Sequence, residues 1–334
     1  MSSPSVSLPQ VKGQSFGSIL RSRPYMFAAI LSFVLLIANI IAEPSFGDPD
    51  NIPQQLATLS PFVLAAMAST PSIISGGGGL DISIGPLLTF INIVMVVWLV
   101  PHGMGDVFIA LPLLLLIGAA IGAINGLLVA VLRYQPVIAT LCMFFVLIGV
   151  NEKIADQPKH AADNFTNDLT GTFLHIPLAL ALPVFIALVW WGLSRTPYHR
   201  ALYATGASDT TAYSAGIDIR KTRVIAYALG GMFAACAGIA LTGLVQQADA
   251  AVSLQYTLIA LAAVALGGTQ LGGGRGGLIG STLGACAIYL LQTLLSALHV
   301  APTWLNVVYG GLLIIGVVVG AKSAAAPARK AATA

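Results

Sequence analysis

The stretch SGGGGLDISIGP, residues Ser75 to Pro86, decides the fold, because it places four consecutive glycines and a carboxylate between two long apolar runs. Backbone that leaves the helical state inside a bilayer must be buried in protein or line an aqueous path. Asp81 adds an ionisable group close to the hydrocarbon, where such groups are rare and usually functional. The stretch therefore predicts an integral membrane protein that handles a polar solute.

The composition favours the same class. Of the 334 residues, 57% are hydrophobic and only 8% are charged, whereas a soluble domain carries about 25% charged residues. No stretch between the apolar segments approaches the size of a second, soluble domain. The net charge of +3 is small and scattered, so no nucleic-acid partner is expected. The three cysteines lie in apolar segments and indicate neither a disulfide framework nor a metal site.

The apolar runs predict the transmembrane helices, since about 20 apolar residues cross the hydrocarbon core. Seven runs approach that length: Tyr25–Ala42, Leu56–Ile74, Val107–Leu132, Phe173–Leu193, Val224–Val245, Leu278–Leu298 and Trp304–Gly320. Three are shorter: Pro86–Val100, Pro136–Val150 and Leu254–Leu266. The predicted fold class is all-α, a bundle of about ten transmembrane helices with glycine-rich breaks. We expect the first run to stay as a signal anchor, since no cleavage site follows it.

The basic residues predict the orientation. With the N-terminus inside, ten spans leave Lys153 and Lys159 as the two outside residues among the 15 Lys and Arg. An excess of basic residues in cytoplasmic loops is typical of membrane proteins. We therefore expect a multi-pass protein with both ends cytoplasmic: a tail over residues 1–23, a transmembrane domain over 24–321 and a second tail over 322–334.

The longest inside loop spans Ser194–Arg223 and is basic at both ends. Residues Tyr198–Ala204 and Asp209–Ala215 favour two short helices, with breaks at Gly206 and Gly216. The acidic first residue of the second helix is well placed to cap it. Two short helices on the cytoplasmic face suit the docking of a soluble partner. A solvated loop held inside by its positive charges is the alternative.

The polar residues inside the spans allow two interpretations. Asp81 either caps the helix that begins near Ser83, where free amides and the helix dipole favour a carboxylate, or faces a translocation path. The cap is favoured because an Asp-x-Ser pattern at a helix start already explains the residue. The neutral polar residues are interpreted as interhelical hydrogen bonds rather than substrate ligands: Asn39, Asn92, Asn125 and Gln292.

Several glycines repeat every fourth residue, and this spacing predicts closely packed helices. The two sets are Gly118, Gly122 and Gly126, and Gly276, Gly280 and Gly284. The string LGGTQLGGGRGG, Leu266–Gly277, contains a G-x-G-x-x-G pattern, but its neighbours are membrane spans rather than a βαβ unit. The string therefore predicts a tight cytoplasmic turn between two helices.

Motifs for chemistry and for energy coupling are scarce. None of the lysines directly follows a glycine, which excludes a P-loop, so energy from ATP would have to come from another chain. The five histidines are isolated and form no H-E-x-x-H motif, so we do not expect an enzyme. A channel would need a carbonyl filter or a ring of charges. Coupling to ions is disfavoured because Asp81 is the main ionisable residue near the spans.

Four separated strings resemble the membrane permease subunits of bacterial ribose-type sugar ABC importers. They are GGGGLDISIG, GAINGLLVAVLRYQPVIATL (Gly122–Leu141), the segment Ala204–Gly238, and ALGGTQLGGGRGGLIGSTLGA (Ala265–Ala285). The strings follow the order of that family, and the similarity spans most of residues 25 to 320. Any one of the strings alone would be a weak signal, but together they are specific.

The resemblance implies a permease subunit that moves a monosaccharide across the bacterial inner membrane. Its fold would be that of the type II ABC importers, with about ten spans in each of two copies or two related subunits. A periplasmic sugar-binding protein would deliver the sugar. Cytoplasmic ABC ATPase subunits would dock on the Ser194–Arg223 loop and bind ATP and Mg, so that this chain would bind no cofactor.

The resemblance also suggests site residues. ATPase coupling would involve Arg200, Gly206, Asp209, Gly216 and Asp218. The translocation path or its packing would involve Gly76, Gly77, Gly78, Gly79, Asp81, Ser83, Asn125, Gly267 and Gly268.

Two departures from the family pattern bear on specificity. Gln135 and Val137 stand where the family has proline and phenylalanine, at the start of the fifth span. Ala204–Ala207 differs from the usual coupling sequence and bears on which ATPase fits. The alternatives are an ABC permease for nucleosides or branched-chain amino acids, or a stand-alone facilitator or channel. Zwitterionic solutes would favour charged groups along the path, and the chain offers almost none.

Overall fold

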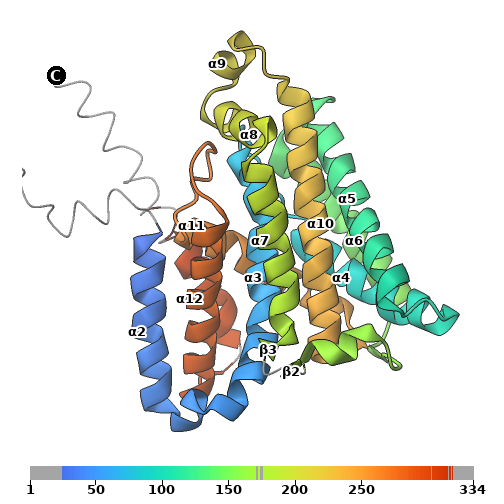
Figure 1. The fold of residues 1–334 in the computed structure, drawn as a ribbon, viewed down its shortest axis with the longest axis vertical. Helices are drawn as coiled ribbons and strands as arrows, with labels where there is room; N and C mark the ends of the chain where they lie inside the picture. The colour runs from blue at the N-terminus through green and yellow to red at the C-terminus, as the bar shows by residue number, and fades with distance from the viewer. Residues whose placement is uncertain are drawn as a thin grey trace, which may run out of the picture.

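The computed structural model describes residues 25–170, 172–173, 176–301, 303–314, 316 and 318. These residues form a bundle in which most helices run along one direction (Figure 1). The longer helices are α2 (Met26–Ala42), α3 (Ile52–Ile74), α5 (Val107–Ala130), α6 (Pro136–Ile154), α7 (Ala181–Ser194), α10 (Ile219–Val245) and α12 (Leu278–Ala297). The shorter ones are α4 (Ile84–Ile93), α8 (Pro197–Ala207), α9 (Asp209–Ser214) and α11 (Ser253–Leu266). The tails expected at residues 1–23 and 322–334 lie outside the described residues.

The all-helical membrane fold is confirmed, and the number of ten spans is approximate. Among the described residues, six helices are long and apolar enough to cross a bilayer, or seven if a pair bent by 87° around residues 195–196 is one span. Three shorter apolar helices are Met26–Ala42, Ala250–Leu266 and Thr303–Ile314. Each of the ten apolar runs thus contains a helix.

The range Phe173–Leu193 is wrong at its start. The backbone there forms two short strands, β2 (Thr172–Phe173) and β3 (Ile176–Pro177), and the 3-10 turn η6 (Leu178–Leu180) before α7 begins. Proline at 177 disfavours helical dihedrals at Ile176 and lacks an amide donor. The run is therefore apolar over its whole length but helical only over its second part.

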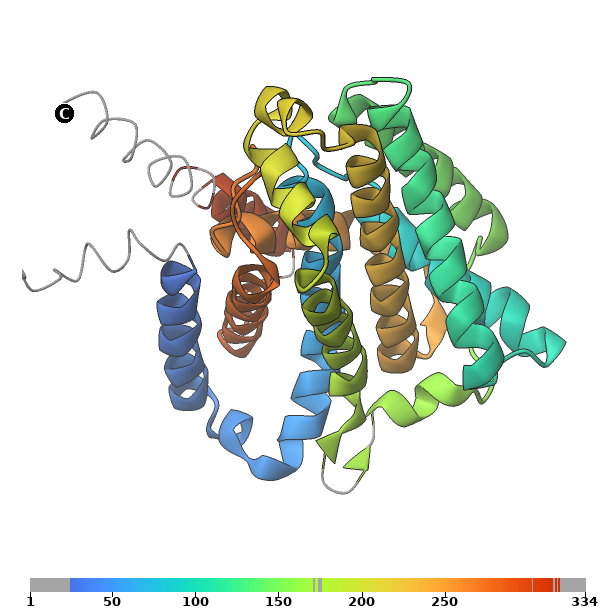
Figure 2. The ribbon, with the colours of Figure 1, turned by 45° about the horizontal axis from the view of Figure 1, so that its top comes forward.

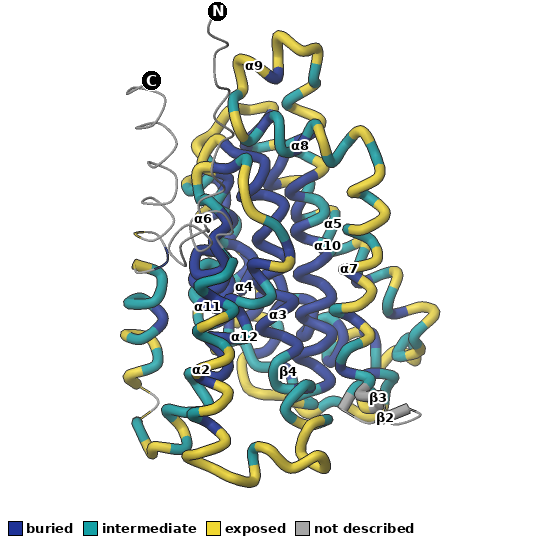
Figure 3. Tube along the Cα trace, turned by 60° about the vertical axis from the view of Figure 1, so that its left-hand side comes forward, coloured by how far each residue is buried: buried dark blue, intermediate teal, exposed yellow. Residues whose placement is uncertain are grey.

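The centre of the bundle consists of α3 and α10. In the most apolar stretch of the span that contains α3, 89% of the residues are buried. In the corresponding stretch of α10, 72% of the residues are buried. For α5 and α6 the shares are 22% and 28%, and these helices lie at the edge of the bundle (Figure 1). Buried residues concentrate along the inner helices (Figure 3). Exposed apolar side chains on α5 and α6, such as Leu116 and Phe145, suit contact with lipid or another protein.

Small residues set the distance between the central helices, as the glycines at every fourth residue predict. On α5, Gly118 faces the carbonyl of Gly231 on α10, and Gly122 faces the carbonyl of Tyr227. A side chain at either position would collide with the backbone of α10. In the second set, Gly280 and Gly284 on α12 lie against Gly267 and Ala263 at the end of α11, whereas Gly276 lies in the loop before α12 and faces Thr269.

Loops that the count of ten spans assigns to one side meet in the structure. At one end, β1 (Lys159–His160) pairs antiparallel with β4 (Gln247–Ala248). At the other end, α8 and α9 lie beside the turn between α5 and α6 (Figures 1 and 2). We call this second end the basic end, because its loops and helix ends carry Arg133, Arg195, Arg200, Arg220, Arg223 and Arg275.

The remaining short elements connect the long helices. The π-helical turn η3 (Val94–Leu99) and the 3-10 turn η4 (Val100–His102) extend α4. The other 3-10 turns are η1 (Pro44–Gly47), η2 (Pro49–Asn51), η5 (Phe165–Thr170) and η7 (Ala250–Val252). These turns bend the chain between helices without adding a second layer to the fold.

Candidate functional site

Three glycine-containing segments touch at the basic end: the break between α3 and α4, the helix α8, and the loop between α11 and α12. We call their meeting point the glycine crossing, which consists of Gly76, Gly206, Gly273 and Gly274. A Cβ built on Gly76 would come 2.6 Å from the Cα of Gly206, and one on Gly274 would come 2.7 Å from the Cα of Ala207. The amide of Gly274 donates to the carbonyl of Ile74 at 3.0 Å. The three segments therefore meet backbone against backbone.

Gly206 does not break its helix, which corrects the sequence-based expectation. The helix α8 runs through it from Pro197 to Ala207. Glycine weakens a helix interior, but here the position has room for no side chain, because the backbone of Ile74 and Gly274 lies against it. Tertiary packing therefore explains the glycine.

Asp209 is not the cap of α9, which is a second correction. The cap is Ser208, whose Oγ accepts a hydrogen bond from the amide of Thr211 at 3.3 Å. Serine at this position is a strong capping residue. Asp209 is the first residue of the helix and its carboxylate is free to face another element.

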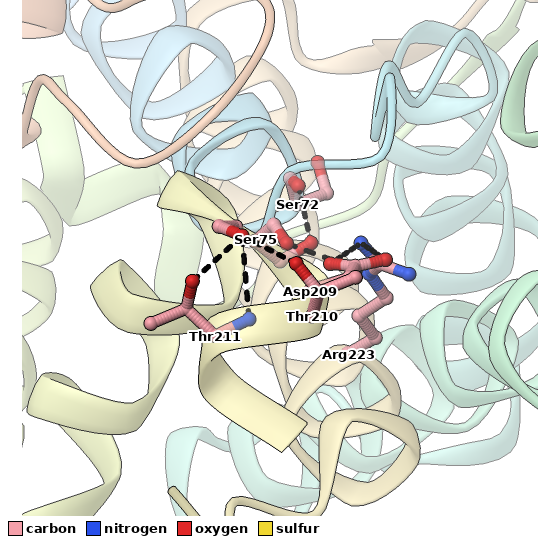
Figure 4. Close-up of polar contacts among 7 residues, drawn as sticks. Ser72, Ser75, Asp209, Thr210, Thr211 and Arg223 are labelled. Carbon is pink, nitrogen blue, oxygen red and sulfur yellow. Dashed lines mark hydrogen bonds and ion pairs between the residues drawn. The ribbon is translucent and has the colours of Figure 1, made fainter. Parts of the chain in front are cut away.

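The carboxylate of Asp209 binds Arg223 near the start of α10. Nη2 of Arg223 donates to both carboxylate oxygens, at 2.7 and 3.0 Å (Figure 4). Nε of the same guanidinium donates to the carbonyl of Ser75 at 3.4 Å. Gly77 also lies against this guanidinium, and the Arg223 side chain is only 13% exposed. Arg223 therefore ties α9 to the break between α3 and α4.

Arg223 is the functional candidate that sequence reasoning missed. In the sequence it is one of many basic residues at the basic end, and nothing marks it as paired. One signal is available: Arg223 lies inside the first turns of a long apolar helix, where a guanidinium needs a partner because burial without one is costly.

Asp81, Ser83 and Asn125 form one buried polar chain. Oδ1 of Asp81 accepts from the amide of Ser83 at 2.9 Å and from its hydroxyl at 2.6 Å. Nδ2 of Asn125 on α5 donates to the Ser83 hydroxyl at 2.8 Å. All three residues are at most 1% exposed. Asp81 therefore does not cap α4, which corrects the capping interpretation: the N-cap is Ser83, no described side chain caps the helix, and the amide that Asp81 engages is that of Ser83, one residue before the helix.

The other neutral polar residues also bond between helices. Nδ2 of Asn39 on α2 donates to the carbonyl of Leu290 on α12 at 2.8 Å. Asn92 donates to Thr242 at 2.9 Å, and Gln292 accepts from the Tyr309 hydroxyl at 2.7 Å. The interhelical interpretation of these residues agrees with the structure.

The remaining candidates lie at the basic end in different settings. Arg200 is exposed on α8, and Gly216 ends the α9 segment with a φ of 76°. Asp218 caps α10, accepting from the Lys221 amide at 3.1 Å, and this hydrogen bond lowers the pKa of its carboxyl. Gly268 has a φ of 77°, where glycine is favoured. Nothing lies within 4 Å of a side chain built at Gly78.

A further contact joins α8 to the loop between α11 and α12. The hydroxyl of Tyr203 donates to the carbonyl of Gly276 at 2.9 Å. Burial raises the pKa of this phenol. The glycine crossing is therefore flanked by two polar contacts, Tyr203 on one side and Arg223 on the other.

A cleft of about 1190 Å³ opens beside Arg223. The α5–α6 turn, α9 and the first residues of α10 line its walls, and Gly77 also borders it. The cleft is distinct from the glycine crossing, since of the crossing's four glycines none lines it. No group of three or more metal-binding side chains occurs among the described residues.

Comparisons with known proteins agree with this membrane architecture. The ribose import permease protein of Bacillus subtilis is 34% identical over 298 residues, which cover 88% of this chain and 91% of that protein. The ribose import permease protein of Haemophilus influenzae is 30% identical over 300 residues, 86% of this chain and 91% of that protein. The fructose import permease protein of Bifidobacterium longum is 29% identical over 316 residues, which cover 87% of this chain and 88% of that protein.

No solved structure matches the chain significantly. The family described as "Branched-chain amino acid transport system / permease component" matches residues 51–317. That range contains the break between α3 and α4, the α8–α9 segment and the loop between α11 and α12, which are the segments that build the site. The chain belongs to this family of transport permeases, which are transport components rather than enzymes.

Proposed function

We propose that this chain is the permease subunit of an ATP-driven importer that moves a monosaccharide across the bacterial inner membrane. The names of its relatives support a sugar, because those proteins are ribose and fructose import permeases. The interior also suits a neutral solute. Among the described buried residues, Asp81 is the one with a charged side chain, and Ser83 engages it. An amino acid carries two charges, which would favour further charged groups along the path.

The glycine crossing is the observation that supports coupling to an ATPase. In this proposal the basic end faces the cytoplasm, and α8 and α9 form the surface on which ATPase subunits dock. Arg200 on α8 is exposed, and Tyr213 on α9 is 76% exposed, so both helices offer side chains to a partner. The chain itself would bind no cofactor, and ATP and Mg would be bound by the ATPase.

Contacts between backbones transmit displacement with little loss. Packed side chains can change rotamer, but the crossing has no side chain to rearrange, and interiors packed this closely transmit strain. A shift of α8 therefore moves both the Ile74–Gly76 segment and the loop at Gly274. The Ile74–Gly76 segment leads through the glycine-rich break to α4, which begins at Ile84. Closure of the ATPase subunits would therefore move α4 through α8, and this movement would shift the permease between inward-open and outward-open states.

Two further partners complete the proposed importer. A periplasmic sugar-binding protein would dock at the end opposite the basic end, where β1 pairs with β4. A second copy of this chain or a related permease would complete the path. The peripheral helices α5 and α6, with few buried residues, leave apolar surface for that contact and for lipid.

Recovery of the complex from native membranes tests this function. The chain would be purified in mild detergent, its partners identified by mass spectrometry, and the complex reconstituted in liposomes with labelled ribose or fructose. We expect an ABC ATPase and a sugar-binding protein to be recovered, and sugar uptake to require both ATP and the binding protein. Uptake by the purified chain alone without ATP would contradict the proposal and favour a facilitator.

A further inference from the structure

The cleft at the basic end carries more positive charge than its neighbours neutralise. Three arginines line it: Arg133 from the α5–α6 turn, and Arg220 and Arg223 from α10. Two carboxylates line it as well, but both are engaged. Asp209 binds Arg223 at 2.7 Å, and Asp218 caps α10 and lies 3.7 Å from the Lys221 ammonium. Among the described residues, the guanidiniums of Arg133 and Arg220 have no hydrogen-bond or ion-pair partner.

Arg133 also has a backbone conformation that an arginine rarely adopts. Its φ is 60°, in the left-handed region where a side chain costs energy and glycine is normally found. Glycine at this position would make the same turn without that cost. Helices commonly end on a residue in this conformation, but strained residues also persist at functional sites, and the arginine at this position supports a role for its side chain.

The wall that carries Arg133 borders the membrane-facing surface of the bundle. Its neighbours Leu132 and Ile138 are 61% and 54% exposed. Leu132 lies in the turn after α5 and Ile138 in the first turn of α6. These two helices have the smallest buried shares among the six candidate spans. In the proposed orientation this places the cleft at the level of the lipid headgroups, within reach of a group from the membrane or from the aqueous phase.

We propose that this cleft binds a phosphate-bearing anion through Arg133 and Arg220. The planar guanidinium donates two parallel hydrogen bonds to phosphate oxygens. Basic pockets at the cytoplasmic ends of transmembrane helices are suited to anionic headgroups. The same chemistry fits the phosphate of a soluble metabolite. Because Arg223 lines the same cleft while it holds Asp209, the anion lies beside the contact that ties α9 to the α3–α4 break.

The proposal rests on the cytoplasmic orientation in the proposed function, but its test needs no transport. The full chain would be placed in nanodiscs of phosphatidylcholine alone or of phosphatidylcholine with phosphatidylglycerol, and its thermal unfolding midpoint measured. Inorganic phosphate would be titrated into the phosphatidylcholine nanodiscs, against sodium chloride of equal ionic strength. We expect phosphatidylglycerol, inorganic phosphate or both to raise the midpoint, and the responding probe identifies the source of the anion.

The matched variants are Arg133→Gln with Arg220→Gln, and Arg195→Gln as the control. Loss of each cleft guanidinium is expected to weaken the apparent affinity about tenfold, so the double variant should lose most of the response. Arg195 stacks on the Trp191 ring at 3.7 Å and does not line the cleft, so its variant should respond like the wild type. Arg133→Gly removes the strain, and should raise the midpoint without ligand while it weakens the response.

Two outcomes would overturn the proposal. The wild type could fail to respond to either probe, or the double variant could respond as strongly as the wild type. If such a double variant also failed to assemble with the ATPase, the two guanidiniums would serve a protein interface instead. The proposed importer would stand in both cases, so its own failure in the uptake assay is distinguishable.

Discussion

Replacing Gly206 with alanine tests whether the glycine crossing couples α8 to the rest of the bundle. The added Cβ would contact the carbonyl oxygen of Ile74 and the nitrogen of Gly274, and it would lie 2.9 Å from the Cα of Gly274. Ordinary contacts of a Cβ begin at 3.4 Å. All of these neighbours are backbone atoms, so none can swing aside. We therefore expect α8 to move away from the loop and from Ile74.

The cost of this substitution follows from three contributions. Overpacking costs about 1–3 kcal/mol, and loss of the bond from the Gly274 amide to Ile74 costs about 1 kcal/mol. Alanine offsets about 1 kcal/mol of this through its preference for the helix. The net expectation for Gly206→Ala is a loss of about 1–3 kcal/mol of stability, together with a larger loss of coupling, because the displaced contact is the one through which the proposed function transmits motion.

The assay compares unfolding midpoint, ATPase rate and sugar uptake in the reconstituted importer. Gly192→Ala is the matched control, because Gly192 is also helical, in α7, and nothing lies within 4 Å of a Cβ built there. That variant should be neutral or stabilised by up to about 1 kcal/mol, with normal uptake. Gly206→Ala should keep ATP hydrolysis and lose most sugar uptake. If the two variants match in both stability and uptake, the mechanism argued from the crossing is wrong.

Three other predictions concern the polar contacts. In a double-mutant cycle, Arg223→Gln and Asp209→Asn should be non-additive by about 1 kcal/mol in stability, since Asp209 is half exposed; additive losses would show that the pair is not coupled. Tyr227→Phe should be neutral or stabilising by up to about 1 kcal/mol in thermal unfolding, because the buried hydroxyl has no partner among the described residues; a clear loss would reveal one. The hydrogen bond from the Lys221 amide lowers the pKa of Asp218 in the folded protein. The ionised carboxylate therefore stabilises the fold fully above about pH 3.9, the ordinary pKa of an aspartate, and this stabilisation is lost as the pH falls through the lower pKa of the folded state. Asp218→Asn, which still caps, should show a flatter acid profile of unfolding midpoint; identical profiles would refute the assignment.

The sequence predicts the elements of this fold well because hydropathy decides them. Each apolar run contains a helix, and the alternation of loops between two sides agrees with the contacts between β1 and β4 and around α8. The prediction fails at the start of Phe173–Leu193, where the residues are apolar but the backbone is not helical until α7 begins at Ala181. Proline at 177 there imposes extended backbone before a run that otherwise looks continuous.

The candidate site was predictable only in part, because its geometry depends on segments distant in sequence. The sequence places Asp81 beside the start of a helix near Ser83, but nothing in it shows that the two side chains bond or that Asn125 lies beside them. Gly206 looks like a helix break, since local propensity is all that a sequence shows. Its actual role depends on Ile74 and Gly274, which only the fold brings to it.

Two kinds of glycine contact therefore have different consequences in this chain. Those between α5 and α10 join helices along their lengths, so they fix the spacing of the core. Those of the glycine crossing join one short surface helix to two loops, and each loop leads into a helix of the interior, α4 or α12. A rigid core with a rigid contact at its surface has few ways to absorb a displacement of α8. The break at Ser75–Ser83 is not helical and contains three consecutive glycines with positive φ, so the backbone between the crossing and α4 has a conformation that glycine adopts readily and other residues rarely adopt.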